Sequence, residues 1–203
     1  LGILPDDPDK LMQAVAAAGA PGVDPTAPGG AAVASAAAGA GADDDHDAPI
    51  RRAADDLAAI VYTSGTTGRS KGAMLTHGNL EANARTLVAL WRFSADDVLL
   101  HALPVYHVHG LFIATHCALL AGARMQLLPR FDAPTVLALL PRSTVLMGVP
   151  THYTRLLEDA HLDRDTAAAM RLFLCGSAPL LPATFEAFAR RTGHRILERY
   201  GMS

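Results

Sequence analysis

The sequence predicts an α/β fold in which a mainly parallel sheet is flanked by helices. After Asp55, short apolar runs of strand length alternate with segments of helical periodicity, the pattern of consecutive strand–helix units. Each run is bounded by Pro or Gly, which mark the connections. Hydrophobic residues make up 50% of the 203 residues and charged residues 18%, so the chain has enough apolar material for a packed core.

The predicted elements follow one another without a fixed repeat. The first is a buried strand, LAAIVYT at 57–63, and the second is a helix that begins behind Thr76, a residue type typical of an N-cap. This helix has apolar residues at helical spacing, namely Leu80, Ala84, Leu87, Val88 and Trp91. Further strands are expected at 98–104, 124–129, 143–150, 170–176 and 194–201. Further helices are expected at 111–122, 133–140, 151–160 and 182–193, the last ending at Gly193.

The chain divides near residue 50. Residues 17–47 are almost all Ala, Gly, Pro, Val and Asp, and such small side chains bury too little area to offset the entropy of ordering. We therefore expect residues 1–54 to be a poorly structured or partial N-terminal segment with an Ala/Gly-rich linker, and residues 55–203 to be the folded part. The alternative for the linker is a small-residue interaction tail.

Charge and composition exclude several classes of partner. The net charge of −3 gives no basic field for nucleic acid or anionic lipid. The apolar run at 111–122 is shorter than the roughly 20 residues that cross a membrane, and the opening residues lack the basic start of a targeting peptide. Cys117 and Cys175 lie in apolar runs, which favours buried free thiols in a reducing, cytoplasmic location.

A polar loop follows the first predicted strand. The sequence TSGTTGRSKG at 63–72 combines hydroxyl side chains, glycines and two cations between a predicted strand and a predicted helix. Glycines let backbone N–H groups turn inward as an anion nest, and Lys71 can offset charge on a triphosphate. The loop is not a Walker A motif, because Ser70 precedes Lys71 and Gly72 follows it. A flexible polar turn is the alternative.

The extended loop YTSGTTGRSKGAMLTHGNL resembles the signature loop of the adenylate-forming superfamily, which includes acyl-CoA synthetases, aryl-CoA ligases and luciferases. LPVYHVHGL at 103–111 resembles its aromatic/His motif, and LCGSAPL at 174–180 with LERYGMS at 197–203 resembles its adenine-binding region. The resemblance covers residues 55–203 and implies a partial AMP-binding domain, that is, an incomplete N-terminal domain of an adenylate-forming enzyme. The glutamate that ligates Mg²⁺ in the family should directly follow Ser203, so we expect the chain to be an internal portion of that domain. We also expect these residues alone to have no or negligible ligase activity.

The resemblance implies a two-step reaction in which ATP and Mg²⁺ activate a carboxylate as an acyl-adenylate and coenzyme A then displaces AMP. Lys71 would stabilise charge on the phosphates, and His107 would gate the channel for the thiol, so these two are the expected catalytic residues. The expected nucleotide-binding residues are Thr63, Ser64, Gly65, Thr66, Thr67, Gly68, Lys71, Gly176, Ser177, Ala178, Tyr200, Gly201 and Ser203. The histidines at 107, 109 and 116 allow a metal site as an alternative, but no further ligand has a recognisable spacing, and no metal ligand is expected.

RSKGAML, STVLMGVPTHYTRLL and GHRILERYGM resemble the malonyl-CoA synthetases most closely, which implies the conversion of malonate, ATP and coenzyme A into malonyl-CoA, AMP and diphosphate. A pocket that buries a second carboxylate needs a fixed positive group. Arg199 is the candidate, His109 is a candidate hydrogen-bond donor, and Met202 completes the expected substrate contacts. Arg199 as an ordinary ion-pair residue and His109 as a satisfied core histidine are the alternatives. The alternatives for function are a ligase for another short or aromatic carboxylic acid, and a non-catalytic nucleotide-binding module.

Overall fold

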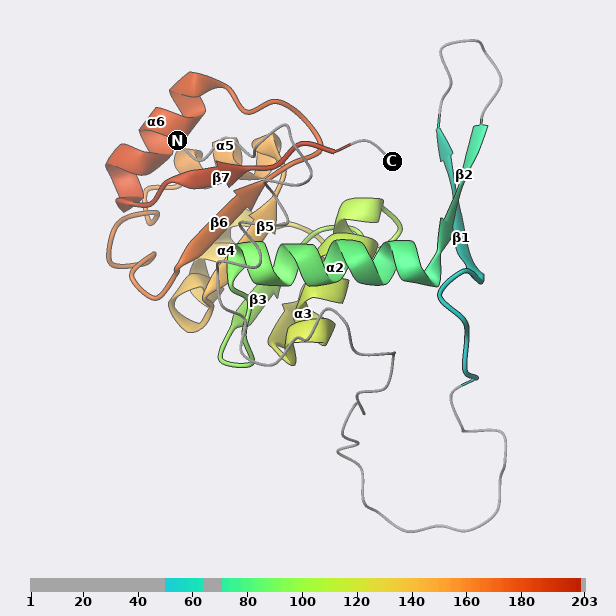
Figure 1. The fold of residues 1–203 in the computed structure, drawn as a ribbon. Coiled ribbons are helices and arrows are strands. Elements are labelled where there is room, and N and C mark those ends of the chain that lie inside the picture. Colours follow the sequence, from blue (N-terminus) through green and yellow to red (C-terminus); the bar gives the residue numbers. More distant parts are fainter. Residues whose placement is uncertain (1–49, 64–70, 202–203) are drawn as a thin grey trace.

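The structure, a computed structural model, describes residues 50–63 and 71–201 (Figure 1). Its strands are β1 (Leu57–Thr63), β2 (Lys71–Thr76), β3 (Val98–His101), β4 (Arg124–Leu127), β5 (Val145–Gly148), β6 (Leu172–Cys175) and β7 (Ile196–Glu198). Its helices are α2 (His77–Trp91), the π-helix η1 (His109–Thr115), α3 (His116–Ala121), α4 (Ala133–Leu139), the 3₁₀-helix η2 (Leu140–Arg142), α5 (Pro150–Glu158) and α6 (Pro182–Thr192). The predicted α/β class is confirmed.

The main sheet has five parallel strands in the order β4-β3-β5-β6-β7. The chain runs from β3 outward to β4 and then returns to place β5 on the other side of β3. This reversal makes the carboxyl ends of β3 and β5 a topological switch point, where open parallel sheets bind ligands. The five predicted strands after residue 97 are all present and shorter than expected, because the predictions included connecting residues.

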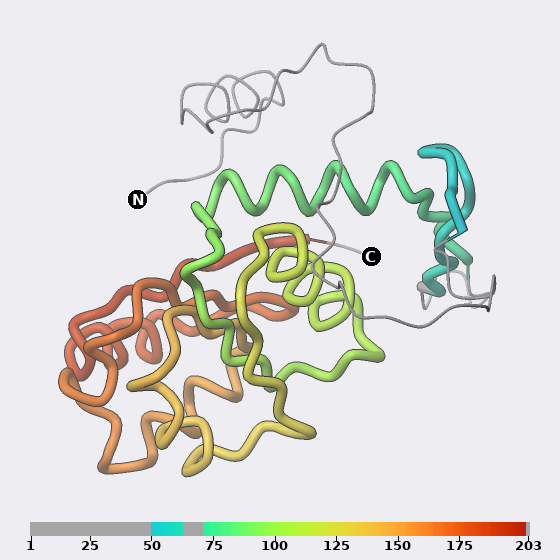
Figure 2. Tube along the Cα trace, turned by 90° about the horizontal axis from the view of Figure 1, so that it is seen from below, coloured from blue at the N-terminus to red at the C-terminus, as the bar shows by residue number. Residues whose placement is uncertain are grey.

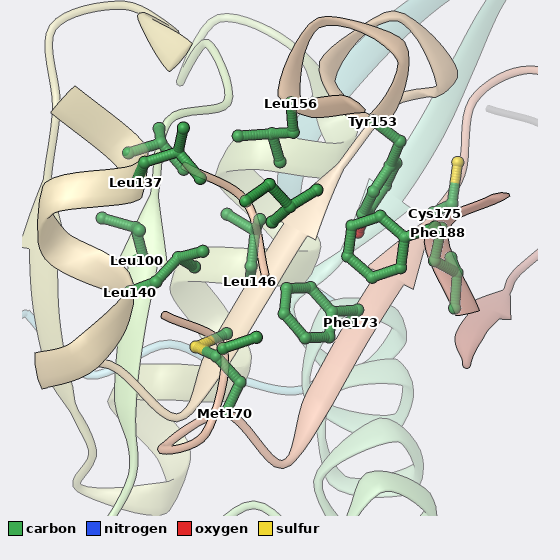
Figure 3. Packing of buried hydrophobic residues seen from close by; sticks show 14 of the residues in the cluster. Leu100, Leu137, Leu140, Leu146, Tyr153, Leu156, Met170, Phe173, Cys175 and Phe188 are labelled. Atoms are coloured by element: carbon green, nitrogen blue, oxygen red, sulfur yellow. The ribbon is translucent and has the colours of Figure 1, made fainter. Parts of the chain in front are cut away.

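Each face of this sheet has its own core. Side chains alternate between faces along a strand, so Leu99 lies in one core and Leu100 in the other. Helices α2 and α3 with η1 cover one face, and α4, α5 and α6 cover the opposite face (Figures 1 and 2). The core under α5 and α6 is rich in aromatic rings: Phe188 contacts Tyr153 and Phe173 edge to face, with ring centroids 5.4 and 4.9 Å apart (Figure 3).

Strands β1 and β2 form a separate antiparallel hairpin, which corrects two expectations. The loop at 64–70, outside the described residues, joins two strands rather than a strand and a helix. Strand β1 is not buried, since Ile60 is 47% and Tyr62 is 70% exposed. The hairpin pairs with no other described strand, so an apolar sequence alone did not determine burial here.

Capping residues place the helix ends as predicted. The Thr76 hydroxyl accepts from the Asn79 N–H, and the Asn79 side chain accepts from the Thr76 N–H, each at 3.1 Å, which forms a capping box. Gly193 ends α6 in the left-handed conformation, with φ 78°. The predicted helix at 111–122 begins earlier, because η1 precedes α3. Within the described ranges, every helix is too short or too polar to span a membrane.

An ion pair between partly exposed Arg171 and buried Asp97 ties the amino ends of the central strands to α2. Arg171 donates from Nε to Oδ1 of Asp97 at 2.7 Å and from a terminal nitrogen to the other carboxylate oxygen at 2.5 Å. Arg171 also donates to the Trp91 carbonyl at the end of α2. Burial raises the pKa of Asp97, but hydrogen bonds from Arg171, Thr144 and Ser94 more than offset it and leave the pKa below its ordinary value.

Candidate active site

Polar residues gather where the parallel strands of the main sheet end. His101 is the last residue of β3, Gly176 and Ser177 follow β6, and Arg199 follows β7. The strand ends are held together by backbone hydrogen bonds, from the Gly176 N–H to the Gly148 carbonyl at 3.1 Å and from the Arg199 N–H to the Cys175 carbonyl at 2.8 Å. The carboxyl edge therefore brings together residues that are far apart in the sequence.

His109, at the start of η1, is buried with 2% exposure. Its Nδ1 lies 3.2 Å from the Ser177 hydroxyl, and its backbone N–H donates to Nδ1 of His107 at 3.1 Å. Its Nε2 has no hydrogen-bond partner among the described residues. Burial, and then the positive charge of Arg199, lower the pKa of His109 to about 3. His109 is therefore a neutral imidazole at neutral pH, with one nitrogen unsatisfied.

Arg199 is half-buried, and burial lowers the pKa of its guanidinium. Within residues 50–63 and 71–201, no hydrogen bond or ion pair of the guanidinium is found. The stem of Arg199 lies over Gly176, where an added Cβ would come within 2.9 Å of Arg199 Cγ and 3.3 Å of His109 Cε1. Glycine at 176 thus allows the cationic and imidazole side chains to share one small space.

Ser177 has a left-handed backbone, with φ 71°, which is uncommon for a residue other than glycine. Such strained conformations persist where the surroundings hold them, often at functional sites. Strands β6 and β7 are neighbours in register, so the loop 176–178 and residues Tyr200 and Gly201 leave the same edge. Ala178 and Gly201 are exposed, and Tyr200 is 85% exposed. This part of the predicted nucleotide-binding set is open to a ligand.

The predicted phosphate loop falls mainly outside the described residues. Ser64, Gly65, Thr66, Thr67 and Gly68 lie there, as do Met202 and Ser203. The two ends of the loop are described: Thr63 ends β1, exposed Lys71 begins β2, and these two residues are paired across the hairpin. Both views place the hairpin on the side toward which the chain runs after β7 (Figures 1 and 2).

The three histidines of the alternative metal reading do not form one group. His107 is exposed and contacts the His109 backbone. His116 instead faces a cavity of about 610 Å³ between α2, α3 and residues 50–54. The centroids of the His116 and Phe112 rings are 5.4 Å apart. Over the described part of the chain, no group of His, Cys, Asp and Glu is arranged to hold a metal ion. Both cysteines, Cys117 and Cys175, are buried free thiols, as predicted.

Sequence reasoning missed two further histidines at this edge. His101 has its Nε2 3.1 Å from the Gly110 carbonyl, while its Nδ1 has no described partner. His152, on the first turn of α5, stacks on Phe131 with ring centroids 3.9 Å apart, and its Nδ1 also has no described partner. Burial, with a smaller effect of Arg155, lowers the pKa of His152 to about 4. The sequence signal that could have pointed to His101 and His152 is a polar residue at the end of an apolar strand or shortly after it.

Comparisons with known proteins show the family of this chain. Residues 7–203 match the model of the AMP-binding enzyme family, so the match starts before the boundary expected at Asp55. The mitochondrial malonate–CoA ligase ACSF3 of Homo sapiens is 42% identical over 162 residues, which is 72% of this chain and 28% of that protein. The chain thus spans under a third of the length of this relative.

Solved structures are similar in sequence and in fold. Apo MatB from Rhodopseudomonas palustris is 60% identical, with a TM-score of 0.75, over 77% of this chain and 31% of that one. The ATP-bound form of MatB has 61% identity and a TM-score of 0.72, over 75% and 30% of the two chains. A malonyl-CoA ligase ternary product complex with methylmalonyl-CoA and AMP has 39% identity and a TM-score of 0.69, over 74% and 34%. This chain belongs to the AMP-binding enzyme family.

Proposed function

We propose that this chain carries part of the acid- and nucleotide-binding site of an ATP-dependent acid–CoA ligase whose acid is malonate. In the first step, a malonate oxygen attacks the α-phosphorus of ATP and diphosphate leaves. In the second, the thiolate of coenzyme A attacks the acyl carbon and AMP leaves, giving malonyl-CoA. The similarity to malonate–CoA ligases supports the reaction class.

The observation that carries the choice of acid is the half-buried Arg199, whose guanidinium has no anionic partner in the described part of the chain. A cation withdrawn from water is stabilised by an opposite charge. The distal carboxylate of malonate supplies that charge and can bind a guanidinium through both oxygens. Nε2 of His109 offers a second contact on the same side of Gly176.

Catalysis in this proposal is electrostatic. Charge builds up on the phosphates during the attack, and preorganised donors lower the barrier. Such donors would come from Lys71, from the hydroxyls and N–H groups of residues 63–68, and from Ser203. The adenine would be held by residues 176–178 with Tyr200 and Gly201. His107 would gate the channel for the thiol. Among the described residues, no cluster of His, Cys, Asp and Glu could hold Mg²⁺. The proposal therefore gives none of these residues a role as a ligand of the ion. Two buried free thiols fit a reducing compartment, and we propose a cytoplasmic location.

The test is thioester formation by the complete protein with ATP, Mg²⁺ and coenzyme A, followed with malonate, methylmalonate, acetate and benzoate. The proposal expects malonate to give the highest kcat/KM and acetate and benzoate to give little product. A preference for benzoate or acetate would replace malonate with another acid. ATP binding without any thioester would favour a non-catalytic nucleotide-binding module. We expect the 203 residues alone to give no detectable thioester.

A further inference from the structure

Ser177 links the loop after β6 to the buried imidazole of His109. Its φ of 71° is a conformation that an L side chain rarely adopts. That conformation places the Ser177 hydroxyl 3.2 Å from Nδ1 of His109. The contact joins a residue of the expected adenine loop to a residue of the expected acid pocket.

The hydroxyl of Ser177 can form this hydrogen bond with either neutral form of the His109 ring. A neutral imidazole has one N–H and one bare nitrogen. Burial and the nearby Arg199 lower the pKa of His109 to about 3, so the ring is neutral near pH 7. A serine hydroxyl can donate or accept. If it donates to Nδ1, the proton is on Nε2; if it accepts from Nδ1, then Nε2 is bare.

A bound carboxylate would favour one of these two forms. An ionised carboxylate can only accept hydrogen bonds, so a bare Nε2 facing it would be repelled. Nε2 is also the ring nitrogen that lacks a partner among the described residues. We propose that Ser177 is a positioning residue that donates its hydroxyl proton to Nδ1 of His109 in the acid-bound state, and so fixes the tautomer whose Nε2–H donates to the acid. The inference rests on the proposed function, because it requires a carboxylate ligand.

The chain offers a substitution that removes the hydroxyl and keeps the backbone. Ser177→Gly suits a left-handed φ, whereas alanine would be strained there. Without the hydroxyl, the Nε2–H tautomer leaves Nδ1 without its donor in a partly buried contact, a loss that corresponds to about a tenfold weaker interaction. We expect the KM for malonate to rise about tenfold, while the KM for ATP changes less than about threefold.

Two further variants separate positioning from backbone effects. Arg92 also has a left-handed backbone, with φ 52°, at the end of α2, so Arg92→Gly makes the same backbone change away from the site. It should leave both KM values unchanged. Ser177→Asn keeps a residue that tolerates the left-handed region and supplies an amide donor, so it should recover part of the malonate affinity.

The direct measurement is ¹⁵N NMR of histidine-labelled complete protein saturated with malonate and a non-hydrolysable ATP analogue, with the His109 signals assigned from a His109→Gln spectrum. The expected shifts are those of a protonated Nε2 and a bare, hydrogen-bonded Nδ1. A bare Nε2 in the malonate complex, or an unchanged malonate KM in Ser177→Gly, would overturn this inference and leave the proposed function standing. If the wild-type protein binds no malonate, the proposed function fails and this inference falls with it.

Discussion

Arg199 and His109 lie against the same glycine, so that one methyl group added at Gly176 would come within 2.9 Å of Arg199 Cγ and 3.3 Å of His109 Cε1. His109 follows β3, the first strand of the main sheet along the sequence, and Arg199 follows β7, the last. Their meeting at the carboxyl edge of the sheet creates a positively charged, partly dry space. In the proposed function, the distal carboxylate of malonate binds in that space.

Gly176→Ala should weaken acid binding more than it weakens folding. The new methyl group forces the flexible stem of Arg199 to move, and a displaced guanidinium loses its geometry toward a carboxylate. We expect the KM for malonate to rise by about 10- to 100-fold and the melting temperature to fall by only a few degrees. Steady-state kinetics with malonate, beside a thermal melt, check both values. An unchanged KM for malonate would mean that the close contact between Arg199 and Gly176 is not part of the acid site.

The depressed pKa of His109 predicts a stability change in acid. Folding holds this pKa at about 3, below the ordinary value of 6.5, so between these values the unfolded chain binds more protons than the folded protein. The contribution to stability is therefore complete above the unfolded pKa and is lost as the pH falls toward about 3. His109→Gln should show a shallower loss of unfolding free energy between pH 6.5 and lower pH in urea titrations. Identical slopes for variant and wild type would contradict the assignment.

Removing Arg171 should destabilise the fold strongly. Arg171→Met leaves the Asp97 carboxylate, whose side chain is 4% exposed, buried without its cation, which costs about 3 kcal/mol of unfolding free energy. Arg85→Met is the matched control, because the pair of Arg85 and Glu81 is 55% exposed on both sides and should contribute less than about 1 kcal/mol. Urea unfolding of both variants measures the difference. Equal losses would show that the pair of Asp97 and Arg171 is not a structural tie.

Lys71→Ala should slow formation of the acyl-adenylate. The charge of Lys71 is expected to stabilise the phosphates in the transition state, and loss of one such donor lowers kcat by about 100- to 1000-fold. Arg85→Ala removes an exposed cation on α2 and should leave the rate near that of wild type. Exchange of labelled diphosphate into ATP in the presence of malonate isolates this first step. A Lys71→Ala rate equal to that of wild type would remove the residue from the catalytic set.

The parallel sheet was predictable because each of its strands is a short apolar run that ends at Pro, Gly or a polar residue. The hairpin was harder to predict. The segment KGAMLT, which forms β2, has few strong strand formers and runs directly into the N-cap Thr76. Burial of β1 could not be inferred either, because burial depends on which elements cover a strand. Ile60 lies against Gly72 of β2 and remains 47% exposed.

The site shows the same division between local and long-range information. The motif resemblance drew attention to His109, Ser177 and Arg199, and the sheet order explains why they meet. His101 lies outside the motifs quoted above, and His152 lies within STVLMGVPTHYTRLL without having been singled out; only the folded structure brings the two histidines to the same edge. The π-helix that positions His109 also escaped prediction, because one extra residue per turn does not alter an apolar pattern enough to be recognised.

The most direct test of the central claim compares malonate with acetate in wild type, Arg199→Ala and Arg195→Ala. Arg195 is an exposed cation on the same strand segment, stacked on Phe185 at 5.3 Å, and serves as the matched control. We predict that Arg199→Ala lowers kcat/KM for malonate by about 100-fold or more and leaves the low activity with acetate unchanged. Arg195→Ala should leave kcat/KM for both acids near the wild-type values. An equal loss with both acids, or no loss with malonate, would contradict the claim that Arg199 binds the second carboxylate.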